Sequence, residues 1–136
     1  MTFGIVPTAP ETGYGYIEAS EPLEPRALTP VPISRFVEKP DQATAEQFLA
    51  SGRFTWNSGM FLFKASAMLA ELERLAPEVV SCCRTALEQY MADLDFLRLD
   101  RDAFAKCPNV AIDVAVMGQT ELGTVLPLAA GWRDGG

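Results

Sequence analysis

The sequence contains no histidine, and its 136 residues include only three cysteines, Cys82, Cys83 and Cys107. Without histidine there is no Ser-His or Cys-His pair to activate a nucleophile, and no zinc site of the usual kind. An odd number of cysteines, two of them adjacent, is a poor basis for a disulfide framework, so we predict reduced thiols. These absences exclude most hydrolase chemistries.

Positive charge and long apolar runs are also scarce. The chain has 11 Lys and Arg against 18 Asp and Glu, a net charge of −7, whereas nucleic-acid binding requires clustered basic residues. A single phosphorylated small molecule needs only one or two. No stretch approaches the roughly 18 consecutive apolar residues of a membrane span. The first residues, MTFGIVPTAPETG, also lack the basic and apolar regions of a signal peptide. We therefore expect a cytoplasmic protein with neither nucleic-acid nor membrane partners.

Strand patterns alternate with helix patterns through the middle of the sequence, which predicts an α/β fold. Apolar or alternating segments typical of strands occur at 2–6, 16–19, 31–37, 59–64 and 123–128. Helical patterns cover about 41–51, 66–77 and 78–106, the last with breaks near Asp93 and Asp100, and a short helix is expected near Asp113. At this length the chain forms one domain or part of a larger one.

Two of these segments carry more detailed expectations. Asp41 or Thr44 can be the N-cap of the first helix, Thr44 and Gln47 match a capping box, and Gly52 predicts its C-terminal end. The segment GMFLFK is continuously apolar, and this pattern is typical of a strand buried on both faces.

Two polar segments near strand ends are candidate binding elements. In TGYGY, Gly13 and Gly15 let the backbone approach a ligand closely, although a simple turn explains them equally well. In FVEKP, Glu38 and Lys39 leave a regular strand on opposite faces and so need separate partners. A carboxylate can accept hydrogen bonds from sugar hydroxyls and an ammonium can neutralise a phosphate, but solvated charges at a strand end are the simpler interpretation.

Two further candidates are an amide and a carboxylate. Asn57, in WNSGMFLF, can hydrogen-bond sugar hydroxyls or its own backbone in a turn. Asp134, in GWRDGG, is a candidate ligand of Mg²⁺, which prefers one or two carboxylates together with waters and phosphates. Asp113 is a weaker metal candidate because a position at the start of a helix explains it.

The order of these motifs is more specific than any one of them. TFGIVPTAPETGYGYIE, FVEKPD, WNSGMFLFKA, IDVAVM and GWRDGG follow one another along nearly the whole chain. In this order they resemble the mannose-1-phosphate guanylyltransferases (GDP-mannose pyrophosphorylases), in particular the bacterial type often fused to a mannose-6-phosphate isomerase domain.

The resemblance implies a Rossmann-like nucleotide-diphospho-sugar transferase domain with a mixed sheet, present here in part. The reaction of the family joins GTP and mannose 1-phosphate to give GDP-mannose and pyrophosphate. The implied site residues are Gly15, whose backbone approaches the sugar, Glu38 and Asn57 for the mannose hydroxyls, and Lys39 for the phosphate. Asp134 is implied as a ligand of the Mg²⁺ cofactor.

The sequence also departs from the family pattern. It contains no Gly-rich loop with Arg and Lys, which in the family wraps the nucleotide triphosphate, and Arg133 and Gly135 replace the usual Ser and a branched apolar residue. We therefore interpret residues 1–136 as the sugar-phosphate-binding portion of the domain. GTP binding is expected only together with the absent nucleotide-binding portion, and the isolated chain is expected to be inactive.

Two alternatives remain open at this point. The chain could be a stand-alone module that binds mannose 1-phosphate or GDP-mannose without catalysis. It could also be a decayed remnant with an incomplete sheet, which forms a homo-oligomer through exposed strand edges. Binding of the sugar phosphate and of GTP, measured separately, distinguishes these alternatives.

Overall fold

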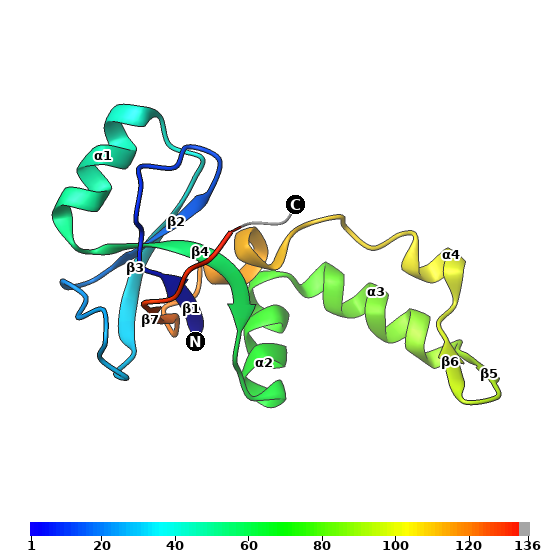
Figure 1. Ribbon diagram of the computed structural model, residues 1–136. Helices are drawn as coiled ribbons and strands as arrows, with labels where there is room; N and C mark the ends of the chain where they lie inside the picture. Colours follow the sequence, from blue (N-terminus) through cyan, green and yellow to red (C-terminus); the bar gives the residue numbers. More distant parts are fainter. Residues whose placement is uncertain (134–136) are drawn as a thin grey trace. The chain divides into compact units, whose positions relative to one another are not determined.

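The computed structural model describes residues 1–133 and divides into two compact units. The first unit comprises residues 1–63 together with the segment from Glu121 onward, and the second comprises Lys64–Thr120. Strands dominate the first unit and helices the second (Figure 1). The predicted α/β class is confirmed. None of the helices in the described part of the chain is long and apolar enough to cross a membrane.

The first unit is built on a five-stranded sheet that closes on itself in the order β1-β4-β2-β3-β7. Its strands are β1 (Thr2–Ile5), β2 (Gly15–Ala19), β3 (Val31–Glu38), β4 (Phe54–Phe61) and β7 (Thr124–Leu128). Strands β1 and β7 pair in parallel and all other neighbours pair antiparallel, so the predicted mixed sheet is also confirmed. The closure of the sheet was not predicted.

Helix α1 (Gln42–Ser51) covers one face of this sheet. Its Phe48 ring stacks on Phe54 with centroids 3.8 Å apart, within a buried cluster that also contains Tyr16 and Trp56. The other face holds a second apolar cluster around Ile17, with Ala19 and Val125. Alternate residues of β2 therefore serve two different cores, as expected for a strand buried on both sides.

The ends of α1 show which of the predicted caps is used. The carboxylate of Asp41 accepts a hydrogen bond from the Thr44 backbone N–H at 2.8 Å, so Asp41 is the N-cap. The predicted Thr44–Gln47 capping box is therefore wrong, because Thr44 already lies inside the helix. Gly52 ends the helix in the left-handed conformation, with φ of 65°, as predicted.

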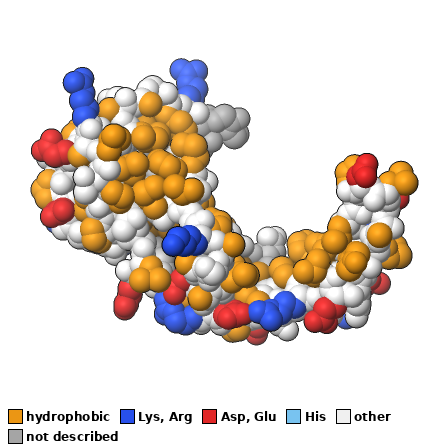
Figure 2. All heavy atoms as spheres, turned by 90° about the horizontal axis from the view of Figure 1, so that it is seen from below, with side chains coloured by type: hydrophobic (Ala, Val, Ile, Leu, Met, Phe, Trp, Pro, Cys, Tyr) orange, Lys and Arg blue, Asp and Glu red, His pale blue; other side chains and the backbone are white. Residues whose placement is uncertain are grey.

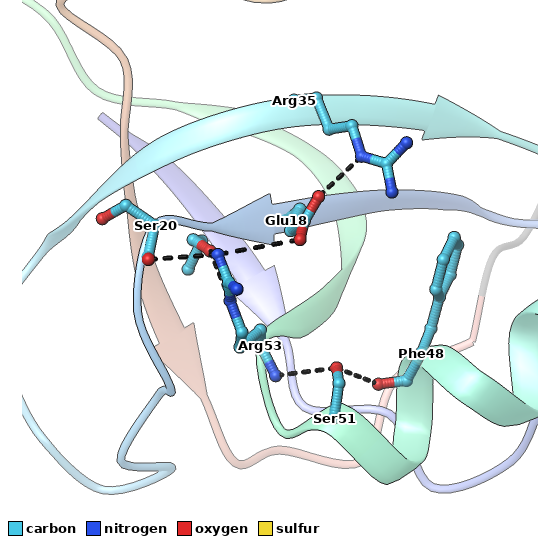
Figure 3. A network of polar contacts seen from close by, with 7 residues as sticks. Glu18, Ser20, Arg35, Phe48, Ser51 and Arg53 are labelled. Carbon is cyan, nitrogen blue, oxygen red and sulfur yellow. Dashed lines mark hydrogen bonds and ion pairs between the residues drawn. The ribbon is translucent and has the colours of Figure 1, made fainter.

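A polar network fixes β2 against β3 and the start of β4 (Figure 3). The Glu18 carboxylate pairs with Arg35 at 2.6 Å on β3 and lies 3.7 Å from Arg53. Arg53 also donates to the carbonyl oxygens of Ala19 and Ser20. These contacts gather at the Ala19 end of β2, away from Gly15 at the other end, so they anchor the sheet and leave the Gly15 end for other uses.

The GMFLFK segment is not the buried strand that its composition suggested. Strand β4 begins earlier, at Phe54, and its buried residues are Phe54, Thr55 and Trp56. The apolar side chains of Met60, Leu62 and Phe63 are exposed. The prediction was wrong because an apolar run does not by itself show which of its residues have a sheet or helix to pack against.

The second unit contains α2 (Ala65–Leu75), α3 (Pro77–Glu88), α4 (Arg101–Phe104) and the short π-helix η1 (Asp113–Met117). The two-stranded sheet of β5 (Met91–Asp93) and β6 (Phe96–Arg98) interrupts the region 78–106, which was predicted to be helical apart from breaks. This hairpin has many exposed apolar side chains, including Leu94 and Phe96, and Figure 2 shows such side chains at the surface of this unit. Within the unit, the Glu71 carboxylate of α2 accepts hydrogen bonds from Arg74 and from Thr120.

Candidate functional site

Three of the predicted site residues lie side by side at one end of adjacent strands. Gly15 pairs with Glu38 between β2 and β3. Between β2 and β4, one step beyond the pair Tyr16–Trp56, the register places Gly15 opposite Asn57. Residues 15, 38 and 57 are thus neighbours across β3, β2 and β4, and directly opposite residues present their side chains to the same face of a sheet. We call Glu38, Gly15 and Asn57 the polar row.

The polar row continues onto a fourth strand at Gly4, which pairs with Asn57. The two polar side chains of the row therefore alternate with glycines. Since neighbouring strands are about 4.8 Å apart, the Cα atoms of Glu38 and Asn57 are roughly 10 Å apart, with no side chain between them. Gly4 was not recognised from the sequence, because only the strand register shows that it belongs to this row.

The Glu38 carboxylate lies over Gly15. A Cβ atom built on Gly15 would be 2.6 Å from Glu38 Oε1 and 3.2 Å from the carboxyl carbon. The absence of a side chain at Gly15 is therefore what allows the carboxylate to lie across the sheet. This close approach supports the interpretation of Gly15 as more than a turn residue, and it orients a hydrogen-bond acceptor over the middle of the row.

Lys39 follows β3 in a conformation that is rare for a residue with a side chain. Its φ is 44°, in the left-handed region, and Pro40 after it is buried. The regular alternation that would send Glu38 and Lys39 to opposite faces thus ends at Glu38. Left-handed backbone at a residue other than glycine costs roughly 1–2 kcal/mol, and such strain is concentrated at functional sites.

The Asn57-Ser58-Gly59 triplet forms an irregularity inside β4. Between the pairs Gly4–Asn57 and Thr2–Phe61, β4 has more residues than β1, and Gly59 adopts φ of 68°. The Asn57 Oδ1 accepts from the Gly59 backbone N–H at 3.1 Å, and the Ser58 hydroxyl donates to the Phe3 carbonyl oxygen. The triplet is therefore a bulge in which Asn57 orders its own backbone, and the amide group also carries N–H donors.

The loop before Gly15 is tied to the sheet by an aromatic residue. The buried Tyr16 donates its hydroxyl to the Glu11 carbonyl oxygen at 2.8 Å, and burial raises the pKa of this phenol, which therefore stays protonated at neutral pH. Tyr14 packs edge-to-face against Trp56 with ring centroids 5.1 Å apart. Gly15 is thus held between two anchored tyrosines.

The described residues do not form a metal site on their own. Residues 1–133 contain no group of three or more Cys, Asp or Glu side chains that could hold a metal ion. Asp134, the predicted metal ligand, lies outside the described residues. Asp113, the weaker candidate, is the first residue of η1 in the second unit, in keeping with its alternative as a helix-start residue.

Comparison with known proteins agrees with the motif order. The family model described as nucleotidyl transferase matches residues 1–136. The xanthan biosynthesis protein XanB of Xanthomonas campestris pv. campestris (strain B100) is 54% identical over 136 residues. Mannose-1-phosphate guanylyltransferase RfbM of Salmonella typhimurium is 48% identical over 136 residues. The alignment covers 100% of this chain but 28% of each of these relatives, so the chain spans little more than a quarter of their length.

Solved structures give the same result for the fold. A crystal structure described as mannose-6-phosphate isomerase from Helicobacter pylori superposes with a TM-score of 0.78 at 34% identity, covering 98% of this chain and 50% of that one. One described as mannose-1-phosphate geranyltransferase from Thermus thermophilus gives 0.76 at 30% identity, covering 97% and 36%. The match over the whole length, the fold and the relatives together show that the chain belongs to the nucleotidyl transferase family, in the branch of the mannose-1-phosphate guanylyltransferases.

Proposed function

We propose that this chain supplies the sugar-phosphate-binding portion of a mannose-1-phosphate guanylyltransferase. The observation that carries the proposal is the polar row, in which Glu38, Gly15 and Asn57 meet although they are far apart in the sequence. A carboxylate and an amide on one face, separated by a glycine, can together accept from and donate to the hydroxyls of a hexose ring. This arrangement favours sugar binding over the simple-turn interpretation of each motif.

Each residue has a distinct role in this proposal. The Glu38 carboxylate accepts hydrogen bonds from mannose hydroxyls, Asn57 contacts the same ring, and the sugar approaches the backbone at Gly15. Lys39 holds the phosphate group, which places a positive charge beside the nucleophilic oxygen without transferring a proton. The chain positions and neutralises the substrate, and no protein nucleophile is required.

The complete reaction requires GTP and a divalent metal ion, which nucleotidyl transferases of this family generally use. A phosphate oxygen of mannose 1-phosphate attacks the α-phosphorus of GTP, and the bond to pyrophosphate breaks. We propose Mg²⁺ as the metal and Asp134 as its ligand. When bound, the ion neutralises charge on the phosphates. Because the 136 residues include no Gly-rich loop with basic side chains, we expect this chain alone to form no GDP-mannose.

Calorimetric titration of the purified chain tests the proposal. We expect saturable binding of mannose 1-phosphate and none of GTP. Absence of mannose 1-phosphate binding would overturn the proposed function, and formation of GDP-mannose by the purified chain would overturn its restriction to the sugar-phosphate portion.

Substitution of Lys39 tests the assigned phosphate contact. Loss of a hydrogen bond to a charged group costs a factor of roughly 10 to 100 in affinity. We expect Lys39→Ala to weaken binding of mannose 1-phosphate by such a factor and to leave the weaker binding of free mannose unchanged. Lys106→Ala, in the second unit, is the matched control and should change neither. Equal losses for the two ligands in Lys39→Ala would exclude the phosphate role.

A further inference from the structure

Trp132 joins two aromatic side chains of the first unit that are distant in the sequence. Its ring lies edge-to-face with Tyr14 at 5.3 Å and is tilted against Trp56 at 6.4 Å, and Tyr14 and Trp56 also contact each other. Trp132 is half-buried and packs against the cluster of Ile5, Tyr16 and Phe54. The three rings form a closed set of contacts, which we call the aromatic triad.

Two members of the aromatic triad are chain neighbours of the polar row. Tyr14 directly precedes Gly15, and Trp56 directly precedes Asn57. Trp56 belongs to the core covered by α1, whereas Asn57, the next residue of the same strand, faces the other way. The rings therefore lie on the face opposite the polar row and make no contact with a sugar bound there. Their effect on the row is transmitted through the backbone.

The β2–β4 ladder alone does not extend to Gly15 and Asn57. The paired residues are Glu18–Phe54, Ile17–Thr55 and Tyr16–Trp56, and the bulge in β4 begins immediately afterwards. The spacing of Gly15 and Asn57 thus depends on what holds their neighbours together. Tyr14 and Trp56 contact each other, and Trp132 contacts both, so a third ring braces the pair from the end of the segment that follows β7 (Thr124–Leu128).

We propose that Trp132 is a positioning residue for the sugar site, which sets the spacing of Gly15 and Asn57 through Tyr14 and Trp56. This inference rests on the proposed function. It goes beyond it by assigning discrimination between hexose epimers to a residue that does not touch the sugar. Epimers differ in the direction of one hydroxyl, so a change in the spacing of the row alters which epimer fits. The phosphate contact of Lys39 lies outside the triad and is unaffected.

The test compares Trp132→Ala with Trp132→Phe, which keeps an aromatic ring, and with Tyr90→Ala, which removes a half-exposed ring from the second unit. Affinities for mannose 1-phosphate, glucose 1-phosphate and inorganic phosphate are measured by calorimetry for each chain. Since a misplacement of about 1 Å can cost up to roughly a hundredfold, we expect Trp132→Ala to lose about tenfold in mannose 1-phosphate affinity. We also expect it to lose most of its preference over glucose 1-phosphate and to retain its affinity for inorganic phosphate. Trp132→Phe and Tyr90→Ala should behave like the unmodified chain.

Three results would overturn the inference, and they can be told apart. If Trp132→Ala keeps both the affinity and the epimer preference, the triad does not position the row. If its affinity falls equally for all three ligands, together with a lower unfolding temperature, Trp132 has only a structural role. If the unmodified chain binds no mannose 1-phosphate, the proposed function fails and this inference fails with it.

Discussion

The carboxylate of Glu38 lies against the backbone of Gly15 on the neighbouring strand, at a place where a Cβ atom would be 2.6 Å from Oε1. Gly15→Ala should therefore displace this carboxylate. Because Glu38 is exposed and flexible, we expect little change in the unfolding temperature but a loss of roughly tenfold in mannose 1-phosphate affinity, the cost of one hydrogen bond to a charged group. Calorimetry and thermal unfolding measure the two effects.

Gly13→Ala is the matched control for this substitution. Nothing lies within 4 Å of a Cβ atom at Gly13, which is in the loop preceding the same strand. Its affinity for the sugar phosphate should equal that of the unmodified chain. If Gly15→Ala binds as tightly as Gly13→Ala, the position of the Glu38 carboxylate does not matter for binding.

Lys39 combines a strained backbone with the proposed phosphate contact, so its replacement by glycine should separate stability from binding. Glycine adopts positive φ without steric cost, and removing this strain gains roughly 1 kcal/mol, partly offset by the greater freedom of the unfolded chain. We expect Lys39→Gly to unfold at a higher urea concentration and to lose most of its affinity for mannose 1-phosphate.

Leu94 provides the control for Lys39→Gly, since its φ is 53° and it lies in the β5–β6 hairpin of the second unit. Leu94→Gly relieves the same kind of backbone strain and should leave ligand binding unchanged. Tight binding of mannose 1-phosphate by Lys39→Gly would show that the ammonium group is not used.

The N-cap of α1 predicts a defined pH dependence. The hydrogen bond from Thr44 lowers the pKa of Asp41 below its ordinary value in the folded chain. The unfolded chain therefore binds this proton more readily, and the stabilisation is fully present above the unfolded pKa of about 3.9. It is lost as the pH falls through the lower pKa of the folded state.

Thermal unfolding across this pH range measures the effect. At neutral pH, Asp41→Ala should unfold a few degrees below the unmodified chain, and Asp41→Asn, which keeps a capping oxygen, should lie between them. The difference between the unmodified chain and Asp41→Asn should shrink as the pH falls. A difference that does not depend on pH would show that the charge of Asp41 contributes nothing.

Cys107 should be the slow thiol of the chain. Burial raises its pKa above the ordinary value, and the neighbouring Cys83 and Cys82 raise it further. Because the thiolate is the reactive form, we expect Cys107 to be alkylated slowly at about pH 8.5, the pKa of an ordinary thiol, and faster at more alkaline pH.

Mass mapping of iodoacetamide-labelled peptides follows this reaction residue by residue. Cys83→Ala should accelerate the labelling of Cys107 only in part, because burial is the larger cause of its raised pKa. Equal labelling rates for Cys107 in the folded chain and in denaturant would contradict the prediction.

Local patterns predicted those elements whose signals lie within a few residues. The start and end of α1 follow from Asp41 and Gly52, since capping involves only residues adjacent in the sequence. The alternation in 31–37 indicated β3 for the same reason. The β5–β6 hairpin was missed because Tyr90 to Leu99 carries no pattern that separates a short exposed hairpin from a helical break. The burial of GMFLFK was predicted wrongly because burial depends on a partner surface.

The sequence by itself determined the membership in the family, through the order of its motifs, and it singled out Gly15, Glu38, Lys39 and Asn57. Only the tertiary structure decided that Glu38, Gly15 and Asn57 are neighbours, that Gly4 extends their row, and that Trp132 reaches Tyr14 and Trp56. The physical reason is that strand register and ring packing join residues tens of positions apart. Such contacts are set by the shared burial of many side chains, and no local spacing encodes them.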